Sequence, residues 1–193
     1  DAYQKQKYLP DLATGKKIGA FALTEPGAGS DAASIQTSSL RANGHYVING
    51  TKTYISNAPE AGVFVTLATR GKSQGYKGID ALIVDGDLDG IEVNQLHGKM
   101  GVRASTVGEI VFKNCHVPVQ NRLGEESVGF RQTMEVLNAS RISIAAQCVG
   151  IAQAALEESV QYARTREVFG GPLGDLQAIQ WMIADMAAET EAA

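Results

Sequence analysis

The sequence predicts an α+β protein with more than one domain: an antiparallel β-barrel or sandwich, followed by part of an antiparallel helical bundle. Two observations carry this prediction. Most of the 21 glycines lie at or before Gly108, so the first half is rich in turns. No proline occurs between Pro118 and Pro172, where apolar residues recur with helical spacing. We therefore expect strands to give way to helices near residue 118.

The composition is that of an ordinary globular chain. Hydrophobic residues make up 44% and charged residues 20% of the 193 residues, which excludes wholesale disorder. A net charge of −4 without a Lys/Arg cluster argues against nucleic acid as a ligand. No apolar run approaches the ~20 residues that span a bilayer. Cys115, Cys148 and three histidines make neither a disulfide framework nor a metal site, so we expect a reducing compartment.

The two ends suggest a piece of a longer protein. Residues 1–14, with Tyr8, Leu9 and Leu12, are expected to be the end of a helix. No signal segment follows Asp1, and no glycine or proline closes the helix that is expected to reach Ala193.

Strand candidates follow one another through the first half. Asn43-Gly44 and Asn49-Gly50 are each expected to form a two-residue hairpin turn, because both central positions require positive φ. Residues 38–56 are thus predicted to be a three-stranded meander. The other candidates are residues 18–23, 63–69, 79–84, 91–95 and 109–114. Strands of this length and spacing are typical of a sandwich or barrel.

Two helices are predicted in the second half. The first opens near Ser127 and runs for about 35 residues, with an apolar face that recurs every three or four residues. That face consists of Phe130, Met134, Leu137, Ile144, Cys148, Ile151, Ala155 and Tyr162, with Arg141 among them. The second helix follows Pro172, with Leu176, Ile179, Ile183 and Met186 on one side. Long helices of this kind usually pack in bundles.

The segment TEPGAGSDA, residues 24–32, is the first candidate site. Gly27, Gly29 and Ala32 satisfy the G-x-G-x-x-G/A dinucleotide pattern. That pattern needs a crossover helix next, and residues 33–37 are too few to form one, so a Rossmann site is not expected. What remains is a tight Pro-Gly loop, either a plain turn or a loop whose amides and Ser30 approach a phosphate or carbonyl.

Polar residues on the helices form a second set of candidates. Arg141 lies on the apolar face of the long helix, with Asn138 one turn earlier. A buried arginine must be paired or bind an anion, so a structural ion pair and a ligand contact both stay open. Arg166 and Phe169 are expected at the end of the long helix, with Gly170 as its stop. No Ser/His/Asp, Cys/His or paired-acid set has convincing catalytic spacing.

The order of the sequence motifs is more specific than any one of them. FALTEPGAGS (residues 21–30), NGTKTYISN (49–57) and KMGVRAS (99–105) come first; EIVFKNCHVP (109–118), YARTREVF (162–169) and LQAIQWMIADM (176–186) follow. This ordered set resembles the acyl-CoA dehydrogenase family over nearly the whole chain. The resemblance implies three parts: residues 1–16 end an N-terminal helical domain, residues 17–120 form a middle β-barrel, and residues 121–193 form part of a C-terminal four-helix bundle.

The resemblance also implies a reaction and its participants. FAD would lie between barrel and bundle, and an acyl-CoA would lose its α-proton and a β-hydride to give a trans-2-enoyl-CoA. An electron-transfer flavoprotein would be the partner, the protein would be a homotetramer, and its location would be the cytoplasm or the mitochondrial matrix.

Site residues are carried over by matching position. Those expected at FAD are Phe21, Leu23, Thr24, Gly29, Ser30, Tyr54, Ile55 and Ser56, together with Arg166, Phe169 and Gln177, which would reach the FAD of a neighbouring subunit. Those expected at the acyl-CoA are Ser30, Ser105, Asn138 and Arg141. The chain departs from the family pattern at four places: Tyr54 stands for Trp, Ser56 for Thr, Asn138 for Asp, and Leu176 for the His that usually accompanies Gln177.

The catalytic base is not expected within this chain. A minority of the family takes it from the residue before the arginine matched by Arg141, and that residue is Ser140 here. The resemblance therefore places a glutamate beyond residue 193. Two alternatives stay open: an acyl-CoA oxidase or fold-related flavin monooxygenase, and a non-catalytic module that binds CoA or a partner protein.

Overall fold

The computed structural model describes residues 1–193, which fall into two compact units, Asp1–Met134 and Glu135–Ala193. The first unit contains a sheet and a short helix, and the second is helical, which confirms the predicted α+β class. No helix is both long and apolar enough to cross a lipid bilayer.

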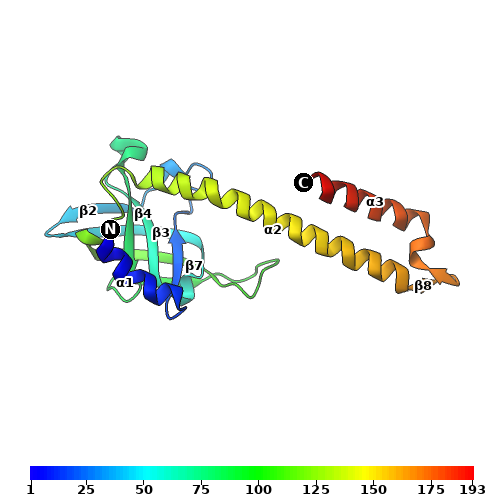
Figure 1. Ribbon diagram of the computed structural model, residues 1–193. Helices are drawn as coiled ribbons and strands as arrows, with labels where there is room; N and C mark the ends of the chain where they lie inside the picture. The colour runs from blue at the N-terminus through cyan, green and yellow to red at the C-terminus, as the bar shows by residue number, and fades with distance from the viewer. The chain divides into compact units, whose positions relative to one another are not determined.

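Seven strands form one sheet, in which β4 pairs with three other strands (Figure 1). They are β1 (Ile18–Ala22), β2 (Ser38–Ala42), β3 (His45–Ser56), β4 (Ala61–Thr69), β5 (Ile79–Asp85), β6 (Ile91–Gln95) and β7 (Val107–Pro118). β5 pairs with one edge of β4, while β1 and β2 share the other edge. From β2 the sheet continues antiparallel through β3 and β7 to β6.

The sheet is mixed, whereas the sequence predicted a wholly antiparallel one. β1 and β2 both run parallel to β4. Parallel neighbours need a long connection. The β2–β3 hairpin lies between β1 and β4 in the chain, and the 12-residue strand β3 lies between β2 and β4.

The predicted meander at residues 38–56 is wrong in its second half. β2 and β3 do meet at Asn43-Gly44, where both residues have positive φ, 48° and 80°. At Asn49-Gly50, however, β3 continues, and its register with β7 shifts. The Asn49 side chain bonds Asn114 instead: its Oδ1 accepts from the Asn114 amide at 2.8 Å and its Nδ2 donates to Asn114 Oδ1 at 3.1 Å. The second Asn-Gly pair therefore lies opposite a β-bulge in β7, where Lys113 and Asn114 face the single residue Asn49.

The inner face of the sheet holds the hydrophobic core. Its largest buried side chains include Tyr46, Ile48, Phe64, Leu82 and Phe112. These come from β3, β4, β5 and β7, so strands far apart in the sequence share one core.

Helix α1 (Ala2–Ala13) packs on the sheet through Tyr8, which contacts Val63 and Ile83. Asp1 caps its start in a capping box with Gln4. The buried Gln4 amide also donates to two backbone carbonyls of residues 120 and 122 at 2.8 and 2.7 Å. The polar contacts of one glutamine thus join the helix to the loop after β7.

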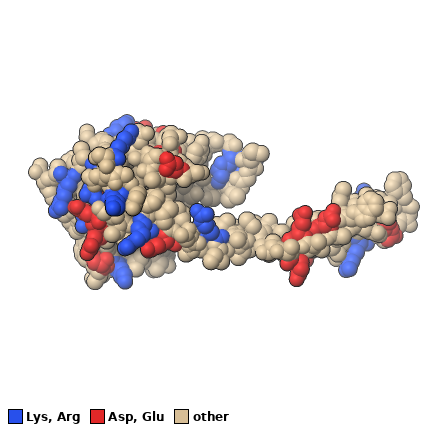
Figure 2. Space-filling model, turned by 90° about the horizontal axis from the view of Figure 1, so that it is seen from above, with Lys and Arg blue, Asp and Glu red and all other residues tan.

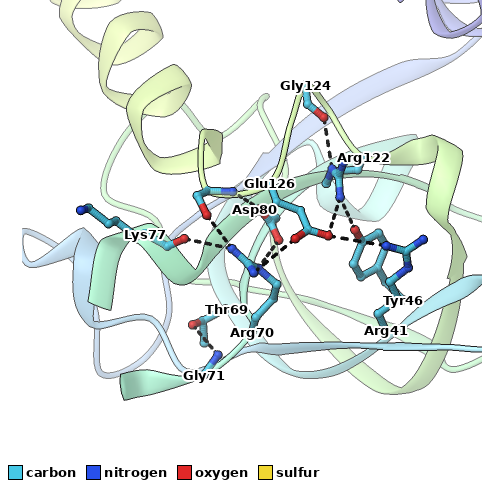
Figure 3. A network of polar contacts seen from close by, with 11 residues as sticks. Arg41, Tyr46, Thr69, Arg70, Gly71, Lys77, Asp80, Arg122, Gly124 and Glu126 are labelled. Carbon is cyan, nitrogen blue, oxygen red and sulfur yellow. Dashed lines mark hydrogen bonds and ion pairs between the residues drawn. The ribbon is translucent and has the colours of Figure 1, made fainter. Parts of the chain in front are cut away.

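A polar network fixes the loop that leads into the long helix α2 (Gly129–Thr165) (Figure 3). Asp80 is fully buried, its Oδ2 lies 2.9 Å from Arg70 Nε, and its Oδ1 accepts from the Ser127 amide at 2.9 Å. Arg70 Nη2 donates to Ser127 Oγ at 2.8 Å. Ser127 itself has φ +71°, a conformation that costs a non-glycine residue about 1 kcal/mol or more. These bonds compensate for that strain.

Glu126 belongs to the same network and faces three arginines. Its carboxylate lies 3.0 Å from Arg122, 3.5 Å from Arg70 and 3.7 Å from Arg41. Arg122 Nη1 also donates to Tyr46 Oη at 2.6 Å, as Figure 3 shows. The loop before α2 is therefore joined to β2, β3 and β5 and to Arg70, the residue that follows β4.

The predicted long helix is confirmed, but its predicted end is wrong. α2 has 37 residues and stops at Thr165. A small hairpin follows, β8 (Glu167–Val168) and β9 (Gly171–Pro172), with Phe169 and Gly170 as its turn at φ +51° and +87°. Arg166 and Phe169 thus lie beyond the helix, and Gly170 serves a hairpin turn rather than a helix stop. The second predicted helix is α3 (Gln177–Ala192).

The middle of α2 carries no charge. From Ile142 to Leu156 every residue is uncharged, and the helix surface is tan over a stretch in Figure 2. Ile142, Ile144 and Ile151 are all more than half exposed. An apolar surface of this kind usually marks a place where another element packs.

Gly129→Ala is expected to destabilise the first unit by about 1–3 kcal/mol. A Cβ on Gly129 would lie 2.5 Å from the Ala81 nitrogen and 2.6 Å from the Asp80 carbonyl carbon, and backbone cannot move aside cheaply. Gly150→Ala is the matched control in the same helix, because nothing lies within 4 Å of its Cβ position. There alanine is expected to stabilise the helix by up to about 1 kcal/mol. Urea unfolding measures both, and equal effects would contradict the assigned backbone contact.

Candidate functional site

Three of the candidate segments lie together in the first unit. The Thr53 amide donates to the Thr24 carbonyl at 2.9 Å, which joins the end of β3 to the loop after β1. The Asn57 amide donates to the Thr106 carbonyl at 2.9 Å, which brings the Ser105 loop to the same end of β3. The structure therefore gathers residues 21–30, 54–56 and 105.

Tyr54 offers an exposed aromatic ring at this place. Its backbone is left-handed, with φ +57°, and its side chain is 72% exposed. The next residue, Ile55, is 2% exposed and packs in the core, so only its backbone can meet a ligand. Phe21 is 39% exposed and Ser56 is also at the surface. An aromatic ring, an apolar residue and a hydroxyl are thus available to a planar ligand with polar edges.

The Pro-Gly loop is a tight turn with two glycines that the protein's own packing does not require. Glu25 and Ala28 exchange both backbone hydrogen bonds, at 3.0 and 3.1 Å. A Cβ added to Gly27 or Gly29 would have no atom within 4 Å, and neither residue has positive φ. Only a short 3₁₀ turn, Ala32–Ser34, follows, which confirms that no crossover helix exists. Because neither packing nor backbone conformation requires glycine here, the lack of a side chain leaves the backbone open to close approach by a ligand.

A buried ion pair beneath the loop was missed by the sequence analysis. Lys52 is completely buried, and its Nζ donates to Glu25 Oε1 at 2.8 Å and to the Leu23 carbonyl at 2.9 Å. The Glu25 carboxylate also accepts from the amides of Gln36 and Thr37 at 2.6 and 2.9 Å. A signal was present: Lys52 follows Tyr46 and Ile48 at even spacing, so it falls on the inward face of β3.

Burial and attraction act on both members of this pair. Burial lowers the pKa of Lys52 from 10.5 to about 8, although the neighbouring Glu25 opposes the change. Burial alone would raise the pKa of Glu25, but attraction to Lys52 and the hydrogen bonds from residues 36 and 37 outweigh it, so that pKa falls below 4.5. Both groups are therefore ionised near neutral pH.

Ser105 borders a polar cavity of about 350 Å³ at the loop between β6 and β7. Lys99 Nζ donates to the carbonyls of Val102 and Ser105, both at 2.6 Å, and so holds the loop. Arg103 also lines the cavity, and its Nε donates to the Lys99 carbonyl. With His97 on the wall as well, the cavity suits a negatively charged group.

The other candidates belong to the second unit. Asn138 and Arg141 are exposed on α2 one turn apart, and Arg141 forms no ion pair. The expectation of a buried arginine is thus wrong within this chain, because no other element covers that face of α2. Ser140 Oγ donates to the Leu137 carbonyl at 2.9 Å, within its own helix.

The β8–β9 hairpin and the start of α3 carry the last three candidates. Phe169 is 98% exposed at the hairpin turn, and Arg166 and Gln177 are exposed too. The Leu173 amide donates to the Arg166 carbonyl at 2.7 Å, which fixes the hairpin against the turn that leads into α3. All three side chains are therefore open to a ligand or to another chain.

Two family models match the chain. Residues 20–115 match "Acyl-CoA dehydrogenase, middle domain" and residues 127–193 match "Acyl-CoA dehydrogenase, C-terminal domain".

Individual relatives agree with these matches. An acyl-CoA dehydrogenase of Bacillus subtilis is 46% identical over 190 residues, covering 98% of this chain and 50% of the relative. The caffeyl-CoA reductase-Etf complex subunit CarC of Acetobacterium woodii is 44% identical over 190 residues, with the same coverage of both. The solved butyryl-CoA dehydrogenase from Megasphaera elsdenii has 41% identity and a TM-score of 0.94 over 100% of this chain and 50% of that one. The chain thus spans about half the length of the curated relatives it matches.

The wild-type protein is expected to gain stability between pH 8 and 10.5 relative to Lys52→Met. In this window the unfolded chain keeps the Lys52 proton while the folded protein releases it, so the free energy of unfolding rises by about 1.4 kcal/mol per pH unit. Urea unfolding followed by circular dichroism measures the difference, since the single tryptophan, Trp181, reports on the other unit. Lys113→Met, which removes an exposed lysine, is the control and should leave the slope unchanged. Parallel curves for wild type and Lys52→Met would contradict the lowered pKa.

Proposed function

The chain belongs to the acyl-CoA dehydrogenase family, and from this premise we propose that the natural protein is an FAD-dependent enzyme that converts an acyl-CoA thioester to a trans-2-enoyl-CoA. Within it, residues 1–16 would end a helical domain, 17–120 would form the middle domain and 121–193 part of the C-terminal domain. The proposal concerns the whole protein, since the chain spans half of its relatives.

One arrangement carries the proposal: the hydrogen bond between Thr53 and Thr24 sets an exposed Tyr54 ring beside a glycine loop open to ligand. These features fit a flavin, which has a planar ring system and polar edges. The residues that would hold it are Phe21, Leu23, Thr24, Gly29, Ser30, Tyr54, Ile55 and Ser56, with Arg166, Phe169 and Gln177 from a neighbouring copy in a homotetramer. Bound there, FAD would supply the acceptor for a hydride from the β-carbon of the substrate.

We propose four residues of the chain as contacts for the acyl-CoA in the whole protein. Ser30 and Ser105 would each contribute a hydroxyl, and the Lys99 and Arg103 side chains, which line a cavity with Ser105, suit the phosphates of CoA. Asn138 and Arg141 supply an amide and a guanidinium that have no partner within this chain. An unpaired guanidinium is a good donor to the polar part of a thioester substrate.

Loss of the α-proton needs a base, and Ser140 does not provide one. Its hydroxyl donates to its own helix, and no base activates it. The proposal therefore assigns this role to no residue of the chain and expects a glutamate elsewhere in the protein.

Reduction of an enoyl-CoA is the second candidate, because a caffeyl-CoA reductase subunit is 44% identical to the chain. The same binding residues would serve either direction, and the electron partner would decide between them. That relative's name places it in a complex with Etf, so we propose an electron-transfer flavoprotein as the partner. Relatives include a bacterial and a mitochondrial protein, so we propose the cytoplasm or the mitochondrial matrix as the location.

The natural polypeptide that contains these residues is expected to bind FAD, and Tyr54→Ala to weaken binding by about 0.5–1.5 kcal/mol, or two- to tenfold. Quenching of flavin fluorescence on binding measures the affinity. Tyr3→Ala is the matched control, since Tyr3 is an exposed tyrosine on α1. A well-folded wild-type protein that takes up no FAD would overturn the proposed function.

Arg141→Ala is expected to lower kcat/KM for an acyl-CoA tenfold or more while FAD stays bound. The fold should be unaffected, because Arg141 is exposed and unpaired in the chain. Arg164→Ala removes another exposed arginine of α2 and should keep nearly wild-type kinetics. Steady-state assays with an artificial electron acceptor compare the two, and unchanged kinetics in Arg141→Ala would remove it from the site.

A further inference from the structure

We propose that the buried Lys52–Glu25 pair is a positioning device for the flavin surface: it holds the Pro-Gly loop and the Tyr54 segment in one fixed relation. The inference rests on the proposed function, since it concerns the residues assigned to FAD. Neither member would touch the cofactor, because Lys52 is completely buried and Glu25 is 6% exposed. Both act through the segments they hold.

The ammonium of Lys52 fixes the start of the loop. It donates to the Leu23 carbonyl at 2.9 Å and to Glu25 Oε1 at 2.8 Å, so it binds the residues on both sides of Thr24. The intervening Thr24 carbonyl accepts from the Thr53 amide. Residues 23–25 are thus held along the end of β3 by three successive contacts.

The carboxylate of Glu25 fixes the far side of the loop. It accepts from the amides of Gln36 and Thr37, where the chain returns toward β2. The Glu25 backbone closes the turn with Ala28. One carboxylate therefore sets the path of residues 25–37, which include the glycines at 27 and 29 and the Ser30 hydroxyl.

Lys52 also restrains the second segment assigned to the flavin, residues 54–56. Lys52 lies two residues before Tyr54, in the part of β3 where the register with β7 shifts between Lys52 and Ile55. Left-handed Tyr54 lies within that irregular stretch. Anchoring the Lys52 end restricts how the bulge can rearrange, and so restricts where the Tyr54 ring points.

A pair of apolar side chains could fill this space but could not hold the Pro-Gly loop by hydrogen bonds. Well-packed hydrophobic residues often match a buried ion pair in stability. They would, however, leave the Leu23 carbonyl and the amides of Gln36 and Thr37 without the partners they now have. The loop would then be free to choose other paths, with loss of its preorganisation for the ligand.

The test separates positioning from stability with Glu25→Gln, Lys52→Met and the double variant Glu25→Gln/Lys52→Met. Each single variant is expected to lose stability and to bind FAD at least tenfold more weakly. The double variant removes both buried charges, so it should be more stable than either single variant. It should still bind FAD at least tenfold more weakly than wild type, because the Leu23 carbonyl has lost its donor. Val117→Ala, a buried truncation in β7 outside the flavin segments, is the control: it should lose stability yet bind FAD within twofold of wild type. Urea unfolding and flavin fluorescence are measured on the same preparations of the natural polypeptide.

The outcomes are distinct. If the wild type binds no FAD, the proposed function fails. If the wild type binds FAD and the double variant binds equally well, the pair is structural only and the inference is overturned. Should a single variant not fold, the double variant still decides the question. A shift in the visible absorption band of bound flavin in the double variant, absent in Val117→Ala, would support the inference.

Discussion

Removing an ammonium group from water costs several kcal/mol, and Lys52, in the second half of β3, has its ammonium group completely buried. Lys52 tolerates it because a carboxylate and a carbonyl lie within hydrogen-bond reach, and because the carboxylate is itself held by two amides. The arrangement needs the Pro-Gly loop, the return to β2 and strand β3 to be in place together. The interior charge thus makes these three segments interdependent, whereas apolar contacts would let each shift separately.

Local signals in the sequence predicted most of the fold. Asn43-Gly44 forms the hairpin turn that its two residue types predict, and α2 follows its apolar periodicity over nearly the predicted length. Predictions failed where a residue far away in the sequence determines the local backbone path. Asn114 forms two hydrogen bonds with the side chain of Asn49, and β3 continues past this residue. Rules based on neighbouring residues cannot include that contact. Gly170 was predicted to stop the helix because glycine commonly follows the last helical turn, whereas the pairing of β8 with β9 makes it part of a hairpin turn.

The candidate site divides in the same way. The ordered motifs predicted the segments that the structure gathers around Thr24 and Thr53, but they gave no role to Glu25 or Lys52 although both lie inside those motifs. Arg141 failed differently: its apolar neighbours on α2 predicted burial, and within the chain that face is open. The exposed isoleucines of α2 and the exposed Phe169 have the same explanation in the proposed assembly, where other helices and a neighbouring copy would cover them.

The two Asn-Gly pairs also differ in their expected rates of spontaneous deamidation. Spontaneous deamidation begins when the glycine nitrogen attacks the asparagine side-chain carbonyl, so it requires a side chain that is free to turn. At Asn43-Gly44 the side chain is exposed at a hairpin tip and no hydrogen bond restrains it. At Asn49-Gly50 two hydrogen bonds to Asn114 restrain it within a continuous strand. Deamidation should therefore occur faster at Asn43, which lies at the opposite end of β3 from Tyr54. The hydrogen bonds from Asn114, in the bulge of β7, should slow the same reaction at Asn49.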